Sequence, residues 1–112
     1  MANMTLKELH SVLGEAGITV FHYEASLENL PYISFIETGT SYNYSSGRAW
    51  REITNVIVDH LTQEEFGGES LELLKKALLK NKVNFTTSTI YYEDLKVIHT
   101  IFTFSIVRDM EV

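Results

Sequence analysis

The chain has 112 residues, of which 45% are hydrophobic and 21% are charged, and it carries a formal net charge of −6 with no cysteine. This length suits a single core, so we expect residues 1–112 to form one domain. The lack of cysteine excludes disulfides, thiolate zinc sites and cysteine nucleophiles. Negative charge repels phosphates, which argues against a protein that binds nucleic acid.

Targeting and membrane segments are not indicated. No apolar run approaches the roughly 18 to 20 residues that a membrane span needs. Residues 1–6 lack the basic stretch followed by an apolar one that marks a signal peptide. We therefore expect a folded, soluble protein that is made in a cytoplasm.

The first helix has a clear start signal. Thr5 and Glu8 fit a capping box, in which the hydroxyl and the carboxylate accept hydrogen bonds from free backbone amides. Gly17 stands where a left-handed cap ends a helix. Between them, apolar residues recur at helical spacing: Leu6, Leu9, Leu13 and Ala16. The β-branched and aromatic run at residues 18–23 then predicts a strand, and Leu30-Pro31 marks a break after it.

Two further strands are predicted at residues 32–36 and 50–61, because both segments are rich in β-branched and aromatic residues. In the second of them, Val56, Val58 and His60 share one face. The opposite face carries Ile53, Asn55, Ile57 and Asp59. Both faces are thus partly apolar, as expected if a helix covers one face and a helix or another subunit covers the other.

Between these strands we predict a long polar loop at residues 39–48, with the sequence GTSYNYSSGR. Neighbouring antiparallel strands need only a short turn, so a connection of this length indicates a function. Tyrosine, tryptophan and arginine often dominate interface energy. We therefore predict that this loop contacts a neighbouring subunit or another protein; the residues expected to do so are Tyr42, Tyr44, Arg48, Trp50 and Arg51. The alternative is a mobile loop with incidental tyrosines.

The second half of the chain predicts one helix and two strands. Residues 69–80 carry a leucine stripe at helical spacing after Gly67-Gly68. Residues 85–91 read as a strand, Glu93-Asp94 as a turn, and residues 96–107 as the longest strand, with period-two alternation. The whole pattern predicts an α+β domain with a mainly antiparallel sheet of about four to five strands, flanked by two helices.

The sequence predicts no catalytic residue, cofactor or metal. Its histidines are His10, His22, His60 and His99, and no two have metal-ligand spacing on a helix. Asp59 and His60 are adjacent, but neighbours on a strand point to opposite faces. We expect His60 and His99 at the edge of the packed face of the sheet. No phosphate-binding loop or nucleophile turn is present either.

Several segments, taken in order, resemble the small tail proteins of long-tailed (siphovirus-type) bacteriophages and prophages, the tail terminator or tail-to-head joining family. These segments are residues 30–33, residues 57–62, the leucine-rich second helix, and residues 91–98 leading into residues 102–104. The resemblance covers nearly the whole chain, and its specificity comes from order, spacing and total length. Related sequences often have Leu-Tyr before the threonine, where this chain has His60-Leu61.

The resemblance implies a subunit that forms a ring, commonly a hexamer, at the head-proximal end of the tail tube. Such a ring stops tube growth and joins the head connector, while DNA passes through its centre without sequence-specific binding. The protein would be assembled in the host bacterial cytoplasm and end in the virion. Two alternatives remain open: another small neck protein, such as a head-completion or connector-adaptor subunit, and a small α+β enzyme or ligand-binding domain.

Overall fold

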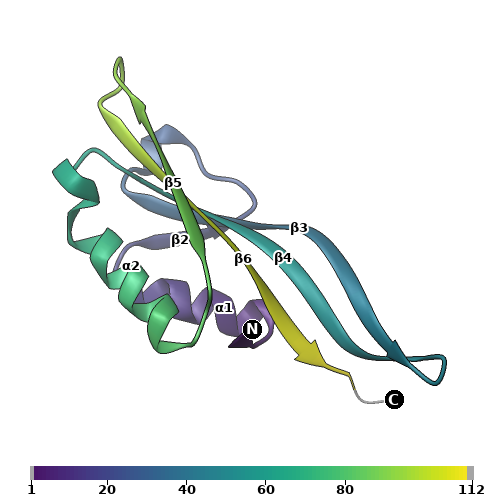
Figure 1. Ribbon diagram of the computed structural model, residues 1–112. Helices are drawn as coiled ribbons and strands as arrows, with labels where there is room; N and C mark the ends of the chain where they lie inside the picture. The colour runs from purple at the N-terminus through teal and green to yellow at the C-terminus, as the bar shows by residue number, and fades with distance from the viewer. Residues whose placement is uncertain (1, 111–112) are drawn as a thin grey trace.

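The computed structural model describes residues 2–110, and Figure 1 shows the arrangement of its elements. In chain order, these are β1 (Ala2–Asn3), α1 (Leu6–Leu13), β2 (Thr19–His22), β3 (Tyr32–Ser45), β4 (Arg48–Thr62), α2 (Gly68–Lys80), β5 (Thr86–Tyr92) and β6 (Val97–Asp109). Short 3₁₀ turns occur at Gly14–Ala16, Leu27–Asn29 and Glu65–Gly67. The predicted α+β class is confirmed.

The two longest predicted strands pair in the centre of the sheet, as expected. β4 and β6 run antiparallel along residues 51–62 and 98–109. β3 pairs antiparallel with the other edge of β4, and β2 adds to β3 in parallel. The outer edge of β6 is shared, because β5 pairs with its first half and the short β1 with its second. The described sheet therefore has six strands, and β1 was too short to be recognised in the sequence.

The helix ends follow the predicted signals. The Thr5 hydroxyl accepts a hydrogen bond from the backbone amide of Glu8 at 3.1 Å, and the Glu8 carboxylate accepts one from the Thr5 amide at 3.2 Å. Gly17, with φ of 81°, ends the 3₁₀ turn that continues α1. Gly67 and Gly68 both have positive φ before α2, a conformation that costs glycine little.

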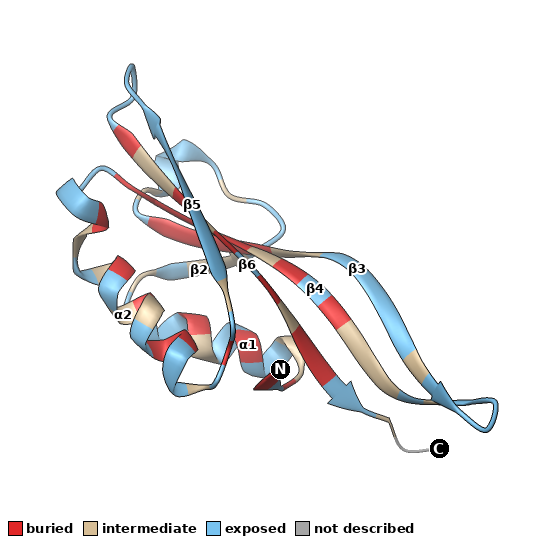
Figure 2. Ribbon diagram, viewed as in Figure 1, coloured by how far each residue is buried: buried red, intermediate tan, exposed pale blue. Residues whose placement is uncertain are grey.

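Both helices pack on the same face of the sheet. The buried core between them is formed by Leu9, Leu13, Leu71, Leu74 and Leu78 from the helices and by Ile33, Phe35, Val56, Val58, Phe102 and Phe104 from the strands. In Figure 2 the buried residues lie on α1 and α2 and on the central strands β3, β4 and β6. The period-two pattern of β6 thus placed its aromatic residues correctly in the core.

Neither α1 nor α2 covers the opposite face. Ile36, Ile57 and Ile101 lie there half-buried. One end of this face is covered by the segment before β3, whose residues Phe21, Ala25 and Leu30 pack against a small buried cluster of Tyr32, Leu61 and Val97. The sequence had left open whether a helix or another subunit covers this side, and neither helix of the described chain does so.

Candidate functional site

The distal halves of β3 and β4 form a hairpin that extends away from the helices, which we call the arm (residues 38–53; Figure 1). The prediction of a long loop at residues 39–48 is wrong. Ladder pairing continues to Ser45 and Arg48, so only Ser46 and Gly47 form the turn. Both have positive φ, 53° and 76°, as a tight two-residue hairpin turn requires.

The sequence did contain a signal for the arm. Thr38, Thr40, Tyr42 and Tyr44 recur at every second position, which is the spacing of a strand. The residues between them are Gly39, Ser41, Asn43 and Ser45. These small polar types favour turns, and they led to the prediction of a loop. Cross-strand pairing with the β-branched residues of β4 outweighs that local preference.

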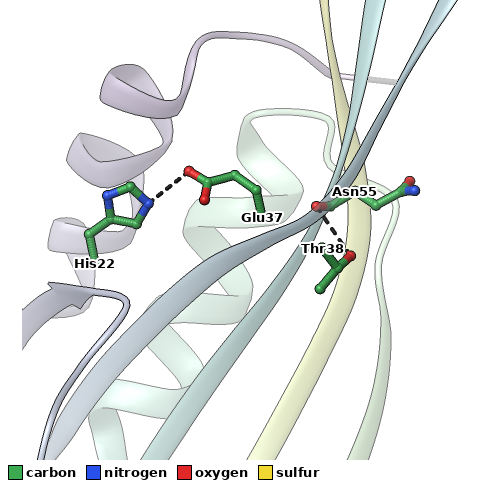
Figure 3. A network of polar contacts seen from close by, with 4 residues as sticks. All are labelled: His22, Glu37, Thr38 and Asn55. Atoms are coloured by element: carbon green, nitrogen blue, oxygen red, sulfur yellow. Dashed lines mark hydrogen bonds and ion pairs between the residues drawn. The ribbon is translucent and has the colours of Figure 1, made fainter.

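The ladder has irregularities at both ends of the arm. Its register shifts between Glu37 and Gly39 and again between Asn43 and Tyr44. At the first shift, the Thr38 hydroxyl donates to the backbone carbonyl of Asn55 at 3.4 Å (Figure 3). Such shifts bend a strand and increase its twist. They fall where the arm leaves the helix-covered part of the sheet and where it approaches its turn.

The two arm tyrosines are exposed and touch each other. Tyr42 is 41% exposed and Tyr44 is 66% exposed. Their rings meet edge to face, with centroids 6.5 Å apart. Residues two positions apart on a strand project from the same face, so the two rings can meet. Together they form an amphipathic surface of the kind that protein interfaces use.

The remaining predicted interface residues lie on β4. Trp50 is 39% exposed, and the guanidinium of Arg51 lies over its ring, 4.6 Å from the centroid. Arg51 also donates to the carboxylate of Asp109 at 3.3 Å, which ties the base of the arm to the end of β6. Arg48 is exposed beside the turn. The structure thus groups Tyr42 with Tyr44 and Trp50 with Arg51.

A second polar group lies on the open face of the sheet. His99 on β6 hydrogen-bonds through Nε2 to the Asp59 carboxylate at 2.7 Å and through Nδ1 to the Tyr92 hydroxyl at 3.0 Å. The three hydrogen-bonded side chains line a hollow of about 250 Å³ together with Tyr32 and Ser34. The pKa of Tyr32 is raised, first by burial and then by the nearby Asp59 and Tyr92. Sequence reasoning missed this group because its members come from three strands.

The positions expected for two histidines need correction. His60 is fully buried in the middle of the helix-covered face, where Nε2 contacts the Ser70 hydroxyl at 2.7 Å. Burial lowers the pKa of His60 to about 4. His99 lies on the opposite face, beside Asp59. Neither histidine is at the edge of the packed face: His60 lies on β4, which β3 and β6 flank on both sides, and His99 lies on the other face.

A wider groove separates the start of α2 from β5. It has a volume of about 630 Å³ and is lined mainly by Phe66, Leu71, Lys75, Tyr91 and Ile98. Phe66 is 91% exposed and has a positive φ of 57°. The charged residues that line the groove in the described chain are Glu65 and Lys75, so the groove lacks the convergent titratable groups of a catalytic site.

Within residues 2–110, no group of three or more histidine, aspartate or glutamate side chains is arranged to hold a metal ion. None of the helices in that range is long and apolar enough to cross a membrane. The sequence matches no protein-family model and no curated protein.

Proposed function

We propose that this chain is a structural subunit of a ring, with six copies, at the head-proximal end of the tail of a long-tailed bacteriophage. The ring ends the tail tube and joins it to the head connector. The observation that carries this proposal is the arm, a paired hairpin that presents exposed Tyr42, Tyr44 and Trp50 well away from the core. The resemblance of the chain to tail terminator proteins supplies the biological setting.

The arm suits this role because its side chains are held in place before binding. A hairpin with cross-strand pairing along most of its length loses less conformational entropy on binding than a mobile loop does. The molecule is also elongated, with extents of 54 × 24 × 20 Å. An arm that projects from such a shape can reach a neighbouring copy or the rim of a tube.

The net charge of −6 fits a channel through which DNA moves. Binding to DNA depends on lysine and arginine contacts to phosphates, which release counterions. An acidic ring surface makes few such contacts, so DNA slides through it instead of being retained. Many proteins without any role in DNA passage are equally acidic, so the charge supports the proposal without carrying it.

Another small neck protein, such as a head-completion or connector-adaptor subunit, would share the ring and the acidic surface. The two roles differ in the proteins that they touch. Binding of the purified chain to tail-tube protein and to portal or adaptor protein, measured side by side, separates them. We expect binding to the tail tube, and loss of that binding in a variant without the arm tyrosines. Binding to portal protein alone would assign the chain to the head side of the neck.

An enzyme or ligand-binding domain is favoured by one observation, the chain of hydrogen bonds from Asp59 through His99 to Tyr92. Both ring nitrogens of His99 are occupied within that chain. The hollow around it is also below the lower end of the range for small-molecule sites, about 300 Å³. We therefore expect His99→Gln to leave ring assembly and tail-tube binding unchanged. A loss of either function in a folded His99→Gln variant would direct attention to this hollow.

A further inference from the structure

Two long stretches of strand edge are free in the described chain. The outer edge of β5 has no strand beside it, and all seven residues of Thr86–Tyr92 are exposed. On the other side of the sheet, β2 covers only the first part of β3, up to Phe35. The outer edge of the arm at residues 38–45 is therefore free as well. Unpaired edges of this length are templates for another strand.

Neither edge carries the charged or proline residues that keep edges apart. Charged residues make up 21% of the chain, but none occurs in Thr86–Tyr92 or at residues 38–45. Proline is also absent from both. Folded proteins usually protect a free edge with lysine, proline or an inward charge. In a chain with net charge −6, two uncharged edges are also the surfaces that a second copy can approach with least repulsion.

The direction of the strands makes the two edges complementary. β5 is antiparallel to β6, β6 to β4, and β4 to β3, so β5 is antiparallel to β3. A second copy that continues the sheet in the same orientation places its β5 antiparallel to the arm of the first. The two free stretches, seven residues and residues 38–45, also match in length.

We propose that β5 of one copy pairs antiparallel with the outer edge of the arm of the next copy, so that the sheet continues from subunit to subunit. This head-to-tail contact uses both free edges, whereas β5 pairing with itself would leave the arm edge open. Within one copy, Thr86 lies level with Ile36 across the sheet. To pair with residues 38–45, β5 of the neighbouring copy must therefore be displaced along the strands towards the tip of the arm. Such a stagger tilts strands in closed sheets. This pairing would form the contact between subunits of the proposed ring, and it rests on the proposal that copies of this chain assemble with one another.

Engineered cysteines test the pairing, because the described chain has no cysteine of its own. Thr89 and Thr40 project from the same face of the sheet, since Thr89 pairs with Thr100 and Thr40 with Thr54. Within one copy, three strand spacings separate the two residues across the sheet, and these alone amount to about 14 Å. A disulfide needs Cα atoms within about 7 Å, so it cannot form inside one chain.

The test uses Thr89→Cys combined with Thr40→Cys, and separately with Tyr42→Cys to sample a second register. Each variant is oxidised at high protein concentration, and a bismaleimide cross-linker is applied in parallel. The matched controls are the three single-cysteine variants. We expect a ladder of covalently linked copies from at least one double variant and no ladder from any single variant, which can at most form dimers.

A charge at the edge provides an independent measurement. Ser88→Lys changes an exposed side chain whose cross-strand partner, Ile101, lies on the open face and outside the core, so the fold should stay intact. It should reduce association between copies at least tenfold, as lysine does on protected edges. Ser11→Lys, at an exposed position on α1, adds the same charge away from both edges and should associate as the unmodified chain does.

The outcomes separate this inference from the proposed ring. Efficient dimers from Thr89→Cys alone would show pairing of β5 with itself and overturn the inference. Rings without linkage in either double variant would overturn it as well but leave the ring in place. A ladder from chains that assemble into open filaments would support the edge pairing and contradict the closed ring. Chains that remain monomeric and unlinked would contradict both.

Discussion

Tyr42 and Tyr44 lie on one side of the arm, with their ring planes at 61° and their centroids 6.5 Å apart. Because the two residues are two positions apart on β3, this contact depends on the extended, paired backbone. The two rings therefore form one exposed aromatic surface on the arm.

Replacing both tyrosines with serine should weaken assembly but not the fold. The side chains are 41% and 66% exposed, so their removal leaves the core unchanged. Thermal unfolding should show a melting temperature close to that of the unmodified chain. Interface tyrosines often contribute about 2 kcal/mol or more, so we expect association to weaken by at least tenfold. Leu79→Ala removes an apolar side chain of similar exposure outside the arm and is the control.

Normal assembly by the Tyr42→Ser, Tyr44→Ser double variant would remove these side chains from the mechanism. The interface would then depend on the strand edges without these side chains, or on the open face of the sheet around Ile36, Ile57 and Ile101. A fall in the melting temperature would instead indicate that the tyrosines stabilise the arm within one chain.

Phe102→Ala should destabilise the chain severely. Phe102 is fully buried under both helices and contacts the ring of Phe85, with centroids 5.1 Å apart. Truncating a buried phenylalanine costs about 3 to 5 kcal/mol, which is a large part of the stability of a domain of this size. Chemical denaturation measures the loss. Thr103→Ala, one residue later and exposed on the other face, should change stability by less than about 0.5 kcal/mol.

Periodicity in the sequence predicted the elements that have one buried face. The capping box at Thr5 predicted the start of a helix, and the alternation around Phe102 predicted which side chains of a strand are buried. Each is a local pattern that fits one kind of structure, and both predictions are confirmed. The arm was not predicted, because the preference of Ser, Asn and Gly for turns is local, whereas strand pairing with residues 48–55 is not. A short-range pattern cannot decide between those two outcomes.

The polar groups were predicted less well for a similar reason. Asp59 is 40 residues from His99 in the chain, whereas Tyr92 is seven residues from it across the hairpin of β5 and β6. The three meet only because β4, β5 and β6 are adjacent. His60 follows Asp59 directly, yet it enters the core while Asp59 faces the open side. The sequence indicated that the two lie on opposite faces. It did not indicate which face the helices cover.

His60 should make stability depend on pH between 6.5 and about 4. Burial, aided by the charge of Lys75, lowers the pKa of His60 in the folded chain to about 4 from 6.5. The unfolded chain therefore binds the proton first as pH falls, and the free energy of unfolding decreases through this range. The full contribution is about 3 kcal/mol.

Comparing the unmodified chain with His60→Gln isolates this effect, since glutamine does not titrate and can still hydrogen-bond to the Ser70 hydroxyl. We expect the variant to lose less stability between pH 6.5 and pH 4 in denaturant titrations. Parallel pH profiles for the two proteins would show that His60 does not couple protonation to unfolding.

Glu37 should make stability depend on pH in the same direction as His60 does, but in a lower pH range. Burial raises the pKa of its carboxyl, but hydrogen bonds from Tyr23 and His22 outweigh this, and the net pKa is lowered. Figure 3 shows the contact with His22, which is 2.7 Å long. The stabilisation is therefore present above pH 4.5 and is lost as pH falls through the folded pKa.

Glu37→Gln should lower stability by about 1 kcal/mol at neutral pH, because the carboxylate is partly solvated. The difference from the unmodified chain should disappear in acid. Glu28→Gln, at an exposed position, serves as the control and should have little effect at any pH. A Glu37→Gln variant as stable as the unmodified chain at pH 7 would mean that these hydrogen bonds contribute nothing net.

The central claim is that copies of this chain form a ring on the end of a tail tube. Electron microscopy of tail-tube subunits polymerising with and without the chain tests it most directly. We predict tubes that stop growing when the chain is added, each with a ring at one end, and no such effect from the Tyr42→Ser, Tyr44→Ser variant. Tubes of unchanged length with bare ends, at concentrations of the chain that saturate every other binding test, would contradict the claim.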